Sequence, residues 1–163
     1  GFHFPETLAF RDELISKFNL KVLDITSELG QIKFNEVYGK LYQRDPDRCC
    51  FINKTAPLKQ IILKYDAWIT GVRKDQTKTR NTLKVFNLQD DGRIKICPLI
   101  NWSERDMWTF HNQNNLPDHP LLTKGYFSIG CAPCTRPMFG DNDKRSGRWF
   151  GNNKTECGIH TDL

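Results

Sequence analysis

Two pairs of cysteines constrain the fold of this sequence more than any other feature. Cys49 and Cys50 are adjacent, and Cys131 and Cys134 form a C-x-x-C pair about eighty residues further along. Four thiolates can hold a tetrahedral zinc ion, or an iron–sulfur cluster with one cysteine on each iron. If both pairs bind one such group, the fold has to bring them together from distant parts of the chain.

The adjacency of Cys49 and Cys50 favours a cluster over a single ion. Neighbouring cysteines rarely both ligate one small tetrahedral zinc ion, whereas a cluster offers them separate iron atoms. We therefore expect an iron–sulfur cluster. Two alternatives stay open on the residues alone: buried core thiols, and a four-cysteine zinc module that binds nucleic acid through basic loops.

Composition limits the class of protein. Six cysteines in a chain with no sign of secretion indicate metal ligation or catalysis before disulfides. The formal net charge of +5 suits an anionic partner but does not separate a nucleotide from nucleic acid. No apolar run is long enough to cross a membrane, and the N-terminus lacks the pattern of a secretory signal. We expect one soluble domain in the cytoplasm.

Helical and strand patterns alternate along the first two thirds of the chain. Helices are expected over 5–18, around 32–41, over 49–65 and from the N-cap Ser103 onward; strands are expected over 20–25, 67–72, 84–88 and 93–99. Asp91-Gly92 joins the last two strands as a hairpin. Cys97 lies in an apolar run and is expected in the core. This alternation predicts an α/β fold, with parallel strands and with ligands near their carboxyl ends, where Arg73 follows the clearest strand.

From residue 112 onward regular periodicity is lost. This irregular segment, 112–163, is too long for an ordinary connection and is of the kind that carries function. Arg145 and Arg148 flank Gly147 and are suited to hold an oxyanion, although a solvated charged loop is the alternative. Cys157 has basic residues upstream and a glycine after it, which suits a nucleophilic thiolate; a spare exposed cysteine is the alternative.

Together these segments resemble the sulfonucleotide reductases, which reduce adenylyl sulfate or its 3′-phosphorylated form. The matching motifs, in chain order, are 3–7, 49–50, 68–76, 128–136, 145–149 and 156–160. The resemblance implies an adenine nucleotide α-hydrolase-like (PP-loop) fold with a mostly parallel sheet flanked by helices. It also implies a single sulfonucleotide reductase domain over 1–163, whose segment 112–163 carries the C-x-x-C pair, the R-x-G-R-W motif and the reactive cysteine.

The resemblance assigns roles to individual residues. It implies that Cys157 is the nucleophile and that a [4Fe–4S] cluster is held by Cys49, Cys50, Cys131 and Cys134. The residues implied to bind substrate are Lys54, Arg73, Arg145, Arg148 and His160. Of these, Lys54 would lie between cluster and substrate.

Relatives with these cluster cysteines typically use adenylyl sulfate. The expected activity is therefore that of an oxidoreductase acting on a sulfur group, in sulfate assimilation and cysteine biosynthesis. It would reduce adenylyl sulfate to sulfite and AMP through an S-sulfocysteine, with thioredoxin or a similar dithiol as reductant. Reduction of 3′-phosphoadenylyl sulfate is the alternative. Neither nucleic acid nor membrane is an expected partner, and a homo-oligomer stays open.

One departure from the family concerns the start of the chain. The His-x-Pro-Glu-Thr motif normally follows a strand that ends in Asp-Thr-Gly, itself preceded by a Ser-Gly-Gly phosphate-binding loop. Here nothing precedes Gly1. We therefore expect an N-terminally truncated fragment that lacks the phosphate-loop part.

Overall fold

The computed structural model describes residues 2–138, 143–161 and 163. The chain divides into two compact units: Gly1–Leu58 with Asp118–Leu163, and Lys59–Pro117. The first unit contains helices and irregular segments, and the second contains the sheet. The prediction of one reductase domain over 1–163 stays a prediction.

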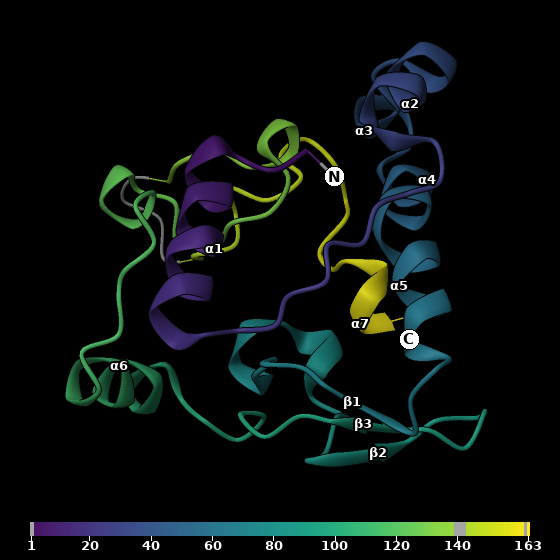
Figure 1. Ribbon diagram of the computed structural model, residues 1–163. Coiled ribbons are helices and arrows are strands. Elements are labelled where there is room, and N and C mark those ends of the chain that lie inside the picture. The colour runs from purple at the N-terminus through teal and green to yellow at the C-terminus, as the bar shows by residue number, and fades with distance from the viewer. Residues whose placement is uncertain (1, 139–142, 162) are drawn as a thin grey trace. The chain divides into compact units, whose positions relative to one another are not determined.

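The second unit is built on a three-stranded mixed sheet. Its strands are β1 (Ala67–Ile69), β2 (Phe86–Leu88) and β3 (Ile94–Ile96), and β3 lies between the other two (Figure 1). β1 pairs with β3 in parallel, and β2 pairs with β3 as the predicted antiparallel hairpin. Together with the helices this confirms the predicted α/β class. The strands are shorter than predicted, and only one of the two pairings is parallel.

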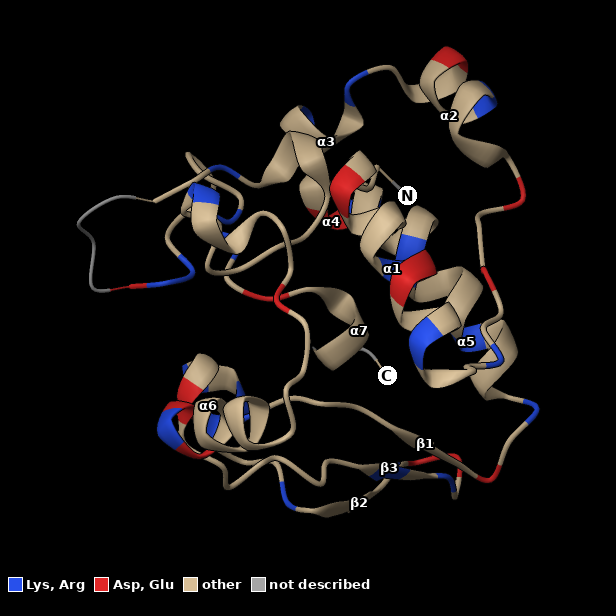
Figure 2. Ribbon diagram, turned by 60° about the vertical axis from the view of Figure 1, so that its left-hand side comes forward, with Lys and Arg blue, Asp and Glu red and all other residues tan. Residues whose placement is uncertain are grey.

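Two further predictions for this unit, a helix start at Ser103 and a buried Cys97, are confirmed. Helix α6 (Glu104–Gln113) begins at Ser103, as predicted, because a capping box closes its first turn. The side chain of Ser103 accepts from the Asp106 N–H at 3.2 Å, and the Asp106 carboxylate accepts from the Ser103 N–H at 2.9 Å. Figure 2 shows this charged helix end. Cys97 is fully buried in the small core with Val72 and Ile100, as predicted.

The first unit begins with α1 (Pro5–Phe18), which has proline in its first turn as predicted. The helix expected around 32–41 is divided into α2 (Gly30–Tyr38) and α3 (Leu41–Arg44), because Gly39 takes a φ of 56° and ends α2. The predicted strand at 20–25 was wrong. Those residues form no strand, and Leu20, Val22 and Leu23 are 47–66% exposed. A strand needs a neighbour to pair its backbone groups, and none of the described strands pairs with this segment.

The helix predicted over 49–65 is present but changes its winding. It starts as α4 (Pro46–Cys50), widens into the π-helical turn η1 (Phe51–Thr55) and continues as α5 (Ala56–Ile62) into the second unit. Pro57 has no N–H to donate to the carbonyl four residues back, so the α-helical ladder is interrupted in this turn. π-helical turns inside α-helices are frequent at functional sites.

The rest of the first unit, as far as its residues are described, is irregular apart from three short helices. These are η4 (Leu122–Lys124), η5 (Ala132–Cys134) and α7 (Gly158–Thr161). Among the described residues of this unit, an isolated bridge joins Thr135 to Arg148, and α7 packs against η1. None of the described helices is long and apolar enough to span a membrane.

Candidate functional site

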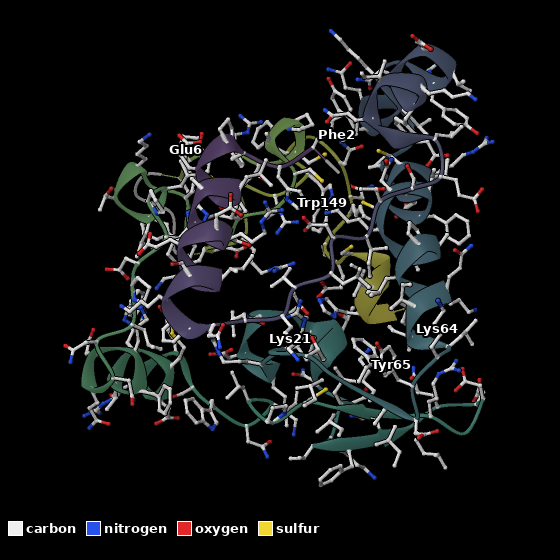
Figure 3. All side chains as sticks on the ribbon, viewed as in Figure 1. Phe2, Glu6, Lys21, Lys64, Tyr65 and Trp149 are labelled. Carbon is white, nitrogen blue, oxygen red and sulfur yellow. The ribbon has the colours of Figure 1, made fainter. Side chains whose placement is uncertain are left out.

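The four cysteines of the two pairs line one pocket in the first unit. Cys49, Cys50 and Cys131 are buried and Cys134 is half-buried. The pocket is partly open to solvent and is also lined by Lys54, Arg148, Trp149 and Phe2. Figure 3 labels Phe2 and Trp149, which reach it from opposite ends of the chain. The fold therefore brings both cysteine pairs to one place.

The adjacent pair is positioned by a capped helix start. The Asp45 side chain accepts from the Arg48 N–H at 2.9 Å, and Pro46 occupies the first turn of α4. Cys49 and Cys50 follow in the last turn. One turn later, the Asn53 amide donates to the Cys49 carbonyl at 3.0 Å. The π-helical turn thus keeps a buried amide against the first pair.

The C-x-x-C pair is held by backbone hydrogen bonds from three segments. Cys134 N–H donates to Cys131 O at 3.0 Å within η5, and Trp149 N–H donates to Cys134 O at 2.9 Å. Ala132 N–H donates to Phe2 O at 2.6 Å. The loop between the two cysteines is therefore fixed by the N-terminal segment on one side and by the R-x-G-R-W segment on the other.

Buried thiols and buried cations share this pocket. Burial raises the pKa of Cys49 to about 11 and raises the pKa of Cys134. Burial works to lower the pKa of Lys54, but electrostatic interactions with the sulfur groups of Cys131, Cys157 and Cys50 raise it above its ordinary value. Lys54 therefore stays protonated and stabilises deprotonated sulfur nearby.

The donor set is consistent with the predicted cluster. No group of three or more His, Cys, Asp or Glu side chains within the described ranges 2–138, 143–161 and 163 is arranged to hold a metal ion. A [4Fe–4S] cluster requires a different arrangement from a single metal ion: four thiolates surround a cavity, and each binds one iron. Four cysteines lining one pocket beside buried cations fit that requirement in their chemistry. The cofactor stays a prediction.

Cys157 lies directly before α7 and is 8% exposed. Its N–H donates to Glu156 Oε1 at 3.1 Å, and His160 N–H donates to its carbonyl at 2.9 Å. A hydrogen bond with the Cys50 thiol lowers the pKa of Cys157 to about 6 and raises that of Cys50. Cys50 cannot donate this proton and ligate iron at once, so this effect belongs to the metal-free protein. The cations Lys54 and Lys154 also lower the pKa of Cys157.

The two predicted arginines sit in different surroundings. Arg148 Nη1 donates to Ile129 O at 3.2 Å, and its Nε is buried with no hydrogen-bond partner among the described residues. A Cβ on Gly130 would lie 2.4 Å from Arg148 Nη2, so only glycine leaves this space. Arg145 Nη2 donates to Thr155 O at 3.1 Å and pairs with Glu156 Oε1 at 3.4 Å.

The structure does not relate Arg73 to this site. Arg73 belongs to the second unit, where it precedes η2 (Lys74–Gln76) and pairs with Asp75 at 3.0 Å. The other predicted residues all lie in the first unit: Cys49, Cys50, Lys54, Cys131, Cys134, Arg145, Arg148, Cys157 and His160. His160 lies on α7, three residues after Cys157. The roles of these residues stay predictions.

Sequence analysis did not single out three residues of this site. Glu156 is buried beside Cys157, and Asn53 is buried beside Cys49. The Lys154 side chain is 9% exposed, forms an ion pair with Asp47 and lies 5.6 Å from the ring centroid of Trp149. Lys154 stands in a polar stretch that is typical of a solvated loop, so no local signal marked it. A carboxylate directly before Cys157 could have been suspected from the Glu-Cys-Gly motif.

The comparisons with known proteins agree on one family. Residues 1–137 match the phosphoadenosine phosphosulfate reductase domain. The chain is 41% identical to an adenosine 5′-phosphosulfate reductase of Streptomyces coelicolor, over 98% of this chain and 69% of that protein. It is 40% identical to adenosine 5′-phosphosulfate reductase 1 of Bacillus subtilis, over 98% and 70%. A phosphoadenosine 5′-phosphosulfate reductase of Gloeobacter violaceus is 41% identical, over 98% and 68%.

A solved structure agrees with the sequence relatives. It is the crystal structure of a phosphoadenylyl-sulfate reductase from Candida auris in complex with phosphate. The TM-score is 0.68 at 29% identity, over 81% of this chain and 66% of that one. The chain thus spans about two thirds of the length of the proteins it resembles.

Proposed function

This chain belongs to the phosphoadenosine phosphosulfate reductase family, and we propose that within it the protein reduces adenylyl sulfate to sulfite and AMP. Its relatives make it an oxidoreductase that acts on the sulfur of a sulfate nucleotide in sulfate assimilation. Adenylyl sulfate is the better choice of substrate because the chain carries the four cysteines expected of enzymes that use it. The Streptomyces and Bacillus relatives bear that name.

The observation that carries the proposal is the placement of Cys157. Its thiol is buried in the first unit next to Cys50, and Lys54 and Lys154 both lower its pKa. Nearby cations favour the thiolate, which is the nucleophilic form of cysteine. The thiolate attacks the sulfur of adenylyl sulfate; a sulfur–sulfur bond forms and the bond from sulfur to the phosphate oxygen breaks. AMP leaves with the electron pair, and Cys157 carries a sulfonate group.

A dithiol such as thioredoxin completes the reaction. One of its thiolates attacks the Cys157 sulfur, and sulfite leaves with the electron pair of the broken sulfur–sulfur bond. Its second thiol then attacks the resulting mixed disulfide and releases Cys157 in the reduced form. The dithiol is oxidised to a disulfide and supplies both electrons.

The basic residues offset the repulsion between a thiolate and an anionic substrate. Arg148 has a buried Nε with no partner among the described residues, so a bound oxyanion would satisfy it. Arg145, Lys54 and His160 are proposed to complete the site from the same unit. Arg73 is proposed as a further substrate residue on the basis of the family motif.

Cys49, Cys50, Cys131 and Cys134 would hold the [4Fe–4S] cluster. When bound, the cluster would supply structural and electrostatic support, since the dithiol supplies both electrons. Lys54, which lines the same pocket, would face both the cluster and the substrate.

Replacing Cys157 tests the proposal directly. The wild-type protein incubated with adenylyl sulfate labelled with radioactive sulfur should retain label, and Cys157→Ser should retain none. Cys97→Ser is the matched control, because Cys97 is a buried core thiol of the second unit. Label that persists on Cys157→Ser would overturn the assignment of the nucleophile.

Reduction of 3′-phosphoadenylyl sulfate is the second candidate, and the name of the Gloeobacter relative favours it. Competition between the two nucleotides for formation of the labelled adduct distinguishes the two substrates.

A zinc module that binds nucleic acid is the alternative of another class. Metal analysis after anaerobic purification distinguishes it, because iron and acid-labile sulfide would support the reductase. A cytoplasmic location and a homo-oligomeric state remain predictions.

A further inference from the structure

We propose that Glu156 is a positioning residue for the nucleophile, which it ties to Arg145. This inference rests on the proposed function, in which Cys157 attacks the substrate. Glu156 is the residue immediately before Cys157, and only 8% of it is exposed. A buried carboxylate lies here next to a thiolate that has to react with an anionic substrate. Its negative charge is unfavourable at this position, so its presence needs an explanation.

One carboxylate oxygen makes both contacts. Glu156 Oε1 accepts from the Cys157 N–H at 3.1 Å and pairs with Arg145 Nη2 at 3.4 Å. The side chains of Arg145 and Glu156 are 18% and 5% exposed, so the pair is largely shielded from water. The backbone of Cys157 and the guanidinium of Arg145 are therefore both held by one oxygen atom of Glu156.

Stability alone does not explain this arrangement. Taking a carboxylate and a guanidinium out of water costs about as much as their attraction returns, and an apolar pair is often as stable. A buried ion pair does, however, restrict both partners to one geometry. At this position the restricted groups are the predicted nucleophile and a predicted oxyanion ligand, so the pair fixes the distance between them.

The charges give the arrangement a second consequence. An unpaired carboxylate beside Cys157 would disfavour the thiolate and repel the substrate. Arg145 offsets that charge, and its position is in turn restrained by Glu156 and by the carbonyl of Thr155. Without the carboxylate, Arg145 keeps its charge for the substrate but loses its orientation. The effect should therefore fall on kcat more than on KM.

Two substitutions separate the contacts. Glu156→Gln keeps an oxygen that can accept from the Cys157 N–H but removes the charge that pairs with Arg145. Glu156→Ala removes both. Glu36→Gln is the matched control, because Glu36 is an exposed glutamate on α2 of the same unit.

The kinetic arm measures steady-state reduction of adenylyl sulfate. Glu156→Gln should lower kcat about ten- to a hundredfold and change KM less than about threefold, as expected for a group that orients another. Arg145→Gln should also lower kcat, and the double variant should lose little more than the worse single variant. Fully additive losses, or a change confined to KM, would contradict the inference.

The second arm needs no substrate. Iodoacetamide should label Cys157 several-fold faster in Glu156→Ala than in the wild-type protein, because its anchored backbone is released, whereas labelling of the buried Cys97 should change little. Equal labelling of Cys157 in both proteins would overturn the inference. If Glu156→Ala speeds labelling of Cys157 but the wild-type protein forms no sulfite, the proposed function is refuted and the anchoring by Glu156 is not. The two failures are therefore distinguishable.

Discussion

The backbone N–H of Trp149 donates to the carbonyl of Cys134 at 2.9 Å, which ties the R-x-G-R-W segment to the C-x-x-C pair. The indole of Trp149 is 4% exposed and lies beside the Arg148 guanidinium, whose Cζ is 4.3 Å from the ring centroid. One residue thus holds a predicted cluster ligand with its backbone and a predicted substrate ligand with its ring.

Trp149→Ala should remove the packing but keep the backbone hydrogen bond. Loss of a buried Trp side chain typically costs about 3–5 kcal/mol of unfolding free energy. The loosened C-x-x-C loop should also lose iron on purification. Denaturant unfolding and iron analysis measure both effects, with Trp149→Phe as the milder control. An alanine variant as stable as the phenylalanine variant would show that the indole is not packed as described.

Gly130→Ala should displace the arginine beside it. The added Cβ would lie 2.4 Å from Arg148 Nη2 and 2.5 Å from its Cζ, and the flexible guanidinium would have to move. We expect KM for adenylyl sulfate to rise about tenfold, with little loss of stability, because the clash is with a side-chain end. Gly71→Ala is the control, since its Cβ would meet only Leu99 at an ordinary 3.9 Å. Equal KM values for the two variants would contradict the placement of Arg148.

The cap of α6 predicts a pH dependence of stability. Hydrogen bonds from the Ser103 side chain and backbone lower the pKa of Asp106 below its ordinary value of 3.8. A lowered carboxyl pKa contributes stability that is present above the ordinary value and is lost as the pH falls through the folded value. Asp106→Asn should therefore lower the thermal midpoint at pH 7, and the difference from wild type should shrink below pH 3.8.

The exposed Asp90→Asn serves as the control for Asp106. It should show a much smaller difference at neutral pH, because its side chain caps no helix in the described part of the chain. A difference for Asp106→Asn that stays constant from neutral to acid pH would rule out the carboxylate cap.

Metal analysis tests the cluster. Anaerobically purified protein should contain about four iron atoms and four acid-labile sulfides per chain. Serine at Cys49, Cys50, Cys131 or Cys134 should each lower the iron content, whereas Cys97→Ser should leave it unchanged. Stoichiometric zinc with no labile sulfide would contradict the prediction.

Local signals made part of the fold predictable. Pro5 marks a helix start through its fixed backbone angle and Ser103 through contacts within one turn, and both helices begin as predicted. The segment 20–25 shows the limit, because its apolar pattern suits a strand but pairing depends on residues elsewhere in the chain. The break at Gly39 was not predicted, and Pro57 indicated only a first turn or a kink.

The candidate site was predictable by residue type and only partly by geometry. The cysteine pairs and Cys157 were found from spacing and from family motifs. The contacts of Lys154 with Asp47, and of Ala132 with Phe2, join residues more than a hundred positions apart, and no local pattern indicates them. Glu156 was visible in its motif, but its burial and its ion pair with Arg145 required the structure.

The most direct measurement of the central claim is peptide mass mapping after one turnover without reductant. Protein mixed with an equal amount of adenylyl sulfate should release AMP and carry one sulfonate group, located on the peptide that contains Cys157. Addition of thioredoxin should then release an equal amount of sulfite and restore the unmodified peptide. AMP release with the sulfonate on another residue, or sulfite formation with Cys157 unmodified throughout, would contradict the account.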